Sequence, residues 1–199
     1  MSVISVSIIQ PPCAYGPELR EPLCLAILAA PFRGARKTEM LRALHLSNAE
    51  LQDHADRASG TQRADIIRSL NGEQMTADEL KRLFQLPETD PTIRCAAIPC
   101  LTACPLEQAV SYIRKGAVSD ADPVLRGLIA VRLADRNEAD ARQLLSLMLE
   151  DPVLSVRESA MESMAAHGEE GALLMLQMAG GASSPKQKLA RRYVSLKGL

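Results

Sequence analysis

Asp90-Pro91-Thr92-Ile93-Arg94 is a short stretch that recurs twice further along the chain. Its later copies are Asp122-Pro123-Val124-Leu125-Arg126 and Asp151-Pro152-Val153-Leu154-Ser155-Val156-Arg157. The copies follow one another at spacings of 32 and 29 residues (122−90 and 151−122). An Asp side chain accepts hydrogen bonds from the free N–H groups at a helix start, and Pro lacks the N–H that would be unpaired at the first helical position. Each Asp-Pro pair therefore predicts the start of an α-helix.

Apolar residues at helical spacing follow each predicted start. They are Ile93, Ala96, Ala97, Cys100, Leu101 and Cys104 in the first copy, Leu125, Leu128, Ile129 and Leu133 in the second, and Val153, Val156, Ala160 and Met164 in the third. A second apolar segment completes each copy, around residues 106–117, 141–148 and 172–176. Two helices in about 30 residues is the period of a helical repeat protein. The sequence therefore predicts an all-α fold, an α-solenoid of helical hairpins.

Asp-Pro followed by a β-branched residue or Leu, then Arg and a small residue, resembles the first helix of HEAT repeats, particularly the short bacterial kind. The resemblance is clear over about residues 90–180. It implies that the second helices line a concave face that holds a partner. The candidate partner-binding residues on those helices are Gln108, Ser111, Lys115, Arg142 and Gln143. The repeats are degenerate, because Pro99 lies inside the first predicted helix, where it should kink or end it, and Arg157 comes two positions late.

The remaining chain divides by composition into three further parts. Residues 1–22 contain Pro11-Pro12 and Pro22, which predict an irregular, extended N-terminal arm. Residues 23–89 predict N-terminal helical hairpins or a cap. Capping boxes at Ser47-Asn-Ala-Glu50 and Thr76-Ala-Asp-Glu79 mark two of the helix starts there. The repeats then occupy residues 90–182.

Residues 183–199 predict a basic C-terminal capping helix that begins at Ser184-Pro185. No acidic residue follows Glu170. Several positive charges on one helix attract anions, so the helix is a candidate site for an anion or an acidic partner. The candidate residues are Lys186, Lys188, Arg191 and Arg192, with Lys197 near the end of the chain.

Composition argues against several kinds of site. The net charge is −1, so nothing in the chain as a whole attracts nucleic acid. The five Cys and three His lack the close spacing of metal ligands, and no phosphate-binding Gly-rich loop or nucleophile elbow occurs, so no metal or cofactor is predicted. The N-terminus lacks the features of a secretory signal, and no stretch approaches the ~20 apolar residues of a membrane span. The expected location is the cytoplasm.

These features favour a non-catalytic protein-binding adaptor or scaffold. The resemblance leaves open an enzyme or enzyme subunit on the same scaffold, since some HEAT-like proteins are bilin lyase subunits and others are DNA glycosylases. The glycosylase is the less favoured of these, because aromatic residues are 3% of the chain and Trp is absent, while trapping a damaged base needs stacking surfaces. Nucleic-acid binding through the C-terminal helix is a third possibility.

Overall fold

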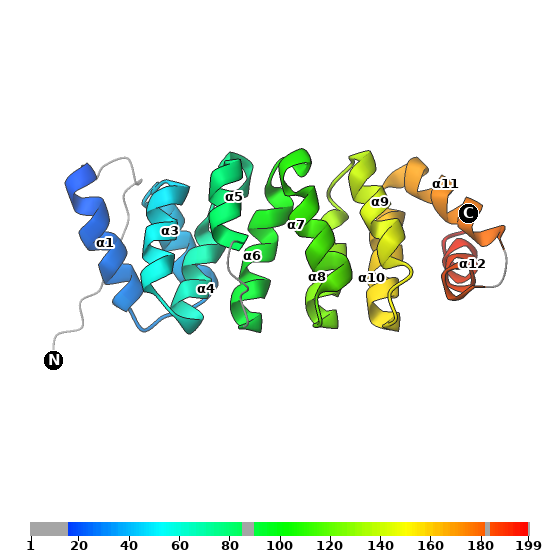
Figure 1. The fold of residues 1–199 in the computed structure, drawn as a ribbon, viewed down its shortest axis with the longest axis horizontal. Helices are drawn as coiled ribbons and strands as arrows, with labels where there is room; N and C mark the ends of the chain where they lie inside the picture. The colour runs from blue at the N-terminus through cyan, green and yellow to red at the C-terminus, as the bar shows by residue number, and fades with distance from the viewer. Residues whose placement is uncertain (1–15, 85–89, 182–183, 199) are drawn as a thin grey trace. The chain divides into compact units, whose positions relative to one another are not determined.

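The computed structural model describes residues 16–84, 90–181 and 184–198, and within these ranges the chain forms α-helices, one 3-10 helix and connecting turns, with no strand (Figure 1). The prediction of an all-α fold is confirmed. Contacts divide the chain into two compact units, residues 1–70 and residues 71–199. Each unit is described by itself.

The described part of the first unit, from residue 16 on, contains four helices: α1 (Pro17–Ala29), α2 (Ala35–Ala43), α3 (Asn48–Arg57) and α4 (Gly60–Ser69). Helix α4 packs against both α2 and α3, and buries Ile66 and Ile67. The predicted capping box at the start of α3 is confirmed, because the Glu50 amide donates to Ser47 Oγ over 3.2 Å and the Ser47 amide donates to Glu50 Oε2 over 2.7 Å.

Helix α1 corrects the predicted N-terminal boundary. An extended arm was expected to reach residue 22, but the helix already begins at Pro17, and residues 1–15 lie outside the described residues. Pro17 occupies the first turn, where a missing N–H costs nothing. Pro22 lies inside the helix on an exposed position, so the carbonyl that it leaves without a donor is near solvent. At the other end, the buried Lys37 ammonium donates to the carbonyls of Leu28 (3.0 Å) and Ala30 (3.1 Å).

The second unit contains η2 (Gly72–Gln74), α5 (Ala77–Phe84), α6 (Pro91–Ala103), α7 (Leu106–Ser119), α8 (Pro123–Leu133), α9 (Ala139–Met148), α10 (Leu154–Ala166), α11 (Gly168–Ala179) and α12 (Pro185–Lys197). Helices α6, α8 and α10 pack side by side as one layer, and α5, α7 and α9 as the other. Helix α12 packs against α11 and α10. The helical pairs follow one another in chain order as an α-solenoid (Figure 1).

The boundary between the units falls after Leu70 rather than at the predicted position before Asp90. The reason is the close approach of η2 to α6. A Cβ on Gly72 would lie 2.2 Å from the Cys100 carbonyl oxygen, so only glycine allows this contact. Met75 also places its sulfur 3.8 Å from Cys100 Sγ. The segment before the first Asp-Pro therefore packs with the repeats.

Two of the three predicted helix starts are confirmed. Asp90 Oδ1 accepts a hydrogen bond from the Thr92 amide (2.8 Å) before α6, and Asp122 Oδ1 accepts one from the Val124 amide (2.9 Å) before α8. Helix α6 continues through Pro99 to Ala103, so this proline does not end it.

The third helix start was predicted at Pro152, but α10 begins two residues later, at Leu154. The first helices of the pairs thus start 32 and 31 residues apart (123−91 and 154−123). Asp151 Oδ1 accepts a hydrogen bond from the Val153 amide over 2.8 Å. In the same way, Asp120 Oδ1 accepts one from the Asp122 amide over 2.8 Å. Asp151 is therefore the counterpart of Asp120, not of Asp122. This explains the late arginine, because Arg157 lies six residues after Asp151 just as Arg126 lies six after Asp120 (157−151 and 126−120).

The core of the second unit is built from aliphatic residues and small side chains. Fully buried alanines occur on facing helices: Ala109, Ala130, Ala141 and Ala160 are all inaccessible to solvent. They allow the helices to approach closely without aromatic residues. Cys100 and Cys104 belong to this core, with exposed fractions of 4% and 0%, as their places on the apolar stripe predicted.

Candidate partner-binding surfaces

The second helices present an exposed face. Gln108, Ser111 and Lys115 are spaced three and four residues apart on α7, so they share one side of that helix, and all three are exposed. On α9, which packs beside α7, Gln143 is exposed, and Leu147 follows four residues later with 42% of its surface accessible. These five residues are called the second-helix face below. Sequence reasoning missed Leu147, because the apolar pattern of α9 does not distinguish an exposed leucine from a core one.

Arg142, the remaining predicted partner-binding residue, contacts other residues of the chain through its side chain. Its side chain is 17% exposed and forms an ion pair with Glu170 of α11, with Nη1 2.7 Å from Oε2. The same Nη1 donates to the Asn137 carbonyl over 2.7 Å. Arg142 therefore links α9 to α11 and is not part of the second-helix face.

Helix α12 is held in place by two of the four cations predicted to bind an anion. Lys186 Nζ lies 3.3 Å from Glu150 Oε1 and 3.3 Å from Ser146 Oγ. Arg191 donates from Nε and Nη2 to the carbonyls of Ala179 and Gly181, each over 2.8 Å. These side chains join α12 to the preceding helices.

The other two predicted cations are accessible but do not act together. The Lys188 side chain is exposed and makes no hydrogen bond or ion pair with the rest of the described chain, although its main-chain amide donates to the Ser184 carbonyl over 3.0 Å. Arg192 is 66% exposed, and its Nη1 lies 3.7 Å from Glu158 Oε1, which is longer than a hydrogen bond. Of the four residues, Arg192 is the one that lines the pocket between α10 and α12.

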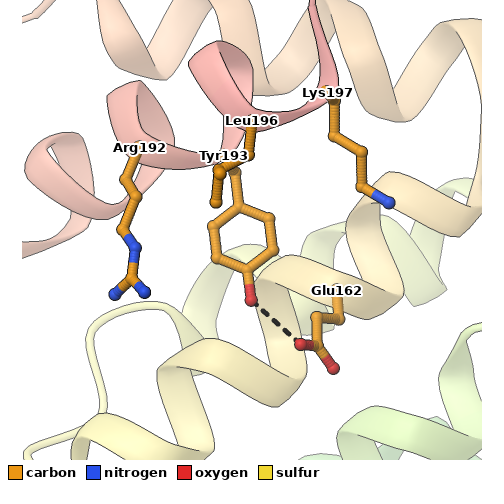
Figure 2. A pocket seen from close by; sticks show the side chains of 5 residues that line it. All are labelled: Glu162, Arg192, Tyr193, Leu196 and Lys197. Carbon is orange, nitrogen blue, oxygen red and sulfur yellow. Dashed lines mark hydrogen bonds between the residues drawn. The ribbon is translucent and has the colours of Figure 1, made fainter.

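That pocket lies between α10 and α12 and has a volume of about 640 Å³ (Figure 2). Glu162 of α10 lines one side, and Arg192, Tyr193, Leu196 and Lys197 of α12 line the other. The Tyr193 hydroxyl donates to Glu162 Oε1 over 3.0 Å. Burial, followed by the hydrogen bond to the Glu162 carboxylate, raises the pKa of Tyr193 to about 12. The sequence marked the basic residues but not Glu162, which lies 31 residues before Tyr193 (193−162) and reaches it only through helix packing.

The cysteine side chains of the described residues do not form part of a metal-binding cluster of His, Cys, Asp and Glu. Within the described ranges, no three His, Cys, Asp or Glu side chains are grouped so that they could hold an ion. The described cysteines Cys24, Cys95, Cys100 and Cys104 form no disulfide with one another. Burial raises the pKa of Cys24 to about 11, while the neighbouring Cys100 lowers the pKa of Cys104. None of the helices described has the length and apolar character needed to cross a membrane.

The packing of helical pairs in two layers defines a helical repeat protein. A comparison with protein-family models matches residues 77–165 to HEAT repeats, which takes in α5 to α9 and nearly all of α10. The predicted resemblance to HEAT repeats is therefore confirmed over this part of the chain. No curated protein matches the chain.

Proposed function

We propose that this protein is a non-catalytic binding scaffold whose protein partner lies across the second-helix face. The observation that carries the proposal is the exposure of Gln108, Ser111, Lys115 and Gln143 on two adjacent helices, although neighbouring charged residues such as Arg142 are used to hold the fold. HEAT repeats commonly act as protein-interaction modules, which agrees with this use of the surface.

The composition of the face suits a polar interface with a small apolar centre. Leu147 supplies an accessible aliphatic side chain beside Gln143, while Gln108, Ser111 and Lys115 offer hydrogen-bond groups. Interfaces between separately folded proteins combine an apolar core with a polar rim in this way. Cys95, Cys100 and Cys104 form no disulfide with one another, which agrees with a reducing compartment such as the cytoplasm for the complex.

Site-specific photo-crosslinking in the native source tests this proposal. A photoreactive residue at Ser111 should yield a discrete protein adduct, whereas one at Ser155, which is exposed on α10 in the other layer, should not. Adding Gln143→Arg should abolish the Ser111 adduct, because a long charged side chain on α9 would obstruct a partner that spans both helices. Identical adducts from Ser111 and Ser155, or an adduct unaffected by Gln143→Arg, would contradict the proposal.

Nucleic-acid binding through α12 is not favoured by the geometry. Lys186 and Arg191, two of the cations it would use, already bind Glu150 and main-chain carbonyls. Phosphate binding would have to replace those contacts.

A further inference from the structure

We propose that Met75, Cys100 and Cys104 form a binding site for a soft monovalent metal ion, Cu(I). All three residues belong to the second unit, and none lies on the second-helix face, so the site goes beyond the proposed function. Their sulfur atoms come from two segments, the residue that ends η2 and the last turn of α6. The donor set is two thiols and one thioether, and soft sulfur ligands of these two kinds select Cu(I).

The backbone holds Met75 against α6. Gly72 lies so close to α6 that a Cβ there would be 2.2 Å from the Cys100 carbonyl oxygen. The Met75 amide donates to the Gly72 carbonyl over 3.2 Å, which ties Met75 to this close approach. The Met75 sulfur consequently lies 3.8 Å from Cys100 Sγ, although the two residues are 25 apart in the sequence. The sequence did not indicate this contact, because it depends on the packing of η2 on α6.

Cys104 supplies the third sulfur from the end of α6. It follows Cys100 by four residues, so the two side chains lie on the same side of the helix. The Cys104 amide and Cys104 Sγ both donate to the Cys100 carbonyl oxygen, over 3.2 and 3.3 Å. The Cys100 side chain is also hydrogen-bonded to Cys104. Cys100 therefore adjoins both of the other sulfur-bearing side chains.

The separation of Cys100 Sγ and Met75 Sδ suits two ligands of one ion. Metal–sulfur bonds of about 2.3 Å place two sulfurs about 3.8 Å apart around a tetrahedral ion and about 4.0 Å apart around a trigonal one. The distance of 3.8 Å in the protein agrees with both geometries. An ion can therefore bind here without moving η2 away from α6.

The donor set distinguishes Cu(I) from zinc. Structural zinc sites use four ligands drawn from Cys, His and carboxylates. Among the described residues, no third side chain of those types is grouped with the two cysteines so that it could hold an ion. The third group is instead the Met75 thioether, a soft ligand that suits Cu(I).

Burial of the site favours the monovalent state of copper. The exposed fractions of Met75, Cys100 and Cys104 are 3%, 4% and 0%. An apolar surround of this kind controls the access of solvent to a bound metal, so water and dissolved oxidants are kept from the ion. Binding replaces the two thiol protons, which pass to solvent, and the copper remains Cu(I) throughout.

Anaerobic titration of the reduced full chain with Cu(I), in competition with a chromophoric Cu(I) chelator, tests the proposal. The chain should retain one Cu(I), and X-ray absorption should show sulfur ligands at about 2.3 Å. Cys100→Ala and Cys104→Ala should each lose the retained ion to the chelator. Met75→Leu should raise Kd by about tenfold or more, the effect of losing one ligand.

Matched variants separate this site from the other sulfur groups. Cys24→Ala and Cys95→Ala remove described thiols outside the site, and Met148→Leu alters another buried methionine of the second unit. Because these residues are not ligands, each change should alter Kd by less than about twofold. An excess of Zn²⁺ should not displace the bound Cu(I), since the site offers zinc only two of its usual ligands.

Several results would overturn the proposal. They are complete loss of Cu(I) from the wild type to the chelator, loss of the ion from Cys24→Ala or Cys95→Ala, equal weakening by Met75→Leu and Met148→Leu, or displacement of Cu(I) by Zn²⁺. Circular dichroism of each variant checks that the helices remain folded. Leucine nearly conserves the volume of methionine, so Met75→Leu decides the outcome if an alanine variant loses helix.

Discussion

Arg126 of α8 forms a buried, two-bond ion pair with Asp151, which lies in the turn before α10. Arg126 Nε lies 2.6 Å from Asp151 Oδ2 and Nη2 lies 2.9 Å from Oδ1, with side-chain exposures of only 8% and 5%. Arg126 Nη1 also donates to the Asp120 carbonyl over 2.6 Å. One repeat earlier, Arg94 Nη1 bonds both carboxylate oxygens of Asp120 at 2.7 Å. Each arginine therefore ties its own repeat to the turn that begins the next.

Asp151→Asn should destabilise the protein by about 3–5 kcal/mol, because it leaves the Arg126 charge buried without its partner. Asparagine keeps an oxygen that can still accept from the Val153 amide, so the loss reports mainly on the ion pair. Urea unfolding followed by circular dichroism measures the change. Glu170→Gln serves as the control, since the Glu170 side chain is 68% exposed, and should cost less than about 1 kcal/mol. Equal losses of unfolding free energy in the two variants would contradict the conclusion that the buried Arg126–Asp151 ion pair stabilises the fold.

Adding Arg126→Met to Asp151→Asn should recover part of the stability lost in the single variant. The double variant no longer buries an unpaired guanidinium, and methionine fills part of the space. Unfolding midpoints of the wild type, both single variants and the double variant complete the cycle. If the two single losses simply add, the residues do not interact energetically.

Low pH should lower the folding stability of the protein, in part because Asp151 becomes protonated. Burial alone would raise the pKa of this carboxyl, but hydrogen bonds from Arg126 and the Val153 amide bring the pKa below its ordinary 3.8. The folded state then binds the proton less tightly than the unfolded chain, so the stability from this group is present above pH 3.8 and is lost as the pH falls below it. The pKa of Glu50, which accepts hydrogen bonds from Ser47, is also lowered, so some acid sensitivity remains in any variant. Urea midpoints at neutral pH and at steps below 3.8 should therefore fall less steeply for Asp151→Asn than for the wild type.

Local signals in the sequence were sufficient for most helix starts. Asp90, Asp122 and Ser47 bond main-chain amides within three residues, and such contacts depend only on neighbouring residue types. The start of α10 could not be read in the same way. In the third repeat, Asp151 of the Asp-Pro pair corresponds to Asp120 of the second repeat. This correspondence becomes clear from the ion pair of Asp151 with Arg126, which is 25 residues away in the sequence.

The candidate sites were only partly predictable for the same reason. Exposure of Gln108, Ser111 and Gln143 followed from their places on the polar side of each helix. The ion pair of Arg142 with Glu170 and the hydrogen bond of Tyr193 to Glu162 each join two separate helices. They depend on how those helices pack, which composition and spacing do not specify. Charge along α12 was visible in the sequence, but the division between cations that hold the fold and cations that remain accessible was not.

Gly171→Ala should destabilise the protein, because a Cβ at this position would lie 1.9 Å from the Met164 carbonyl oxygen, at the close approach of α10 and α11. The obstructing atom belongs to the backbone and cannot rotate away, so we expect a loss of about 1–3 kcal/mol. Gly127→Ala is the matched control in α8. There the new Cβ would meet only Ser159 Oγ at 3.7 Å, and the substitution should stabilise by roughly 0.5–1 kcal/mol through helix propensity. Thermal or urea unfolding measures both, and a destabilising Gly127→Ala would count against the described packing of α8.

The hydrogen bond between Tyr193 and Glu162 predicts an alkaline transition. The pKa of Tyr193 is raised from 10 to about 12, first by burial and then by the Glu162 carboxylate. The folded state therefore holds the phenolic proton more tightly than the unfolded chain, so this contribution is present below pH 10 and is lost as the pH rises towards 12. Phenolate absorbance should show a late phase that Tyr193→Phe removes and Glu162→Gln moves to lower pH, since the glutamine carries no charge to oppose ionisation. A late phase that persists in Tyr193→Phe would belong to another of the three tyrosines and would contradict the contact.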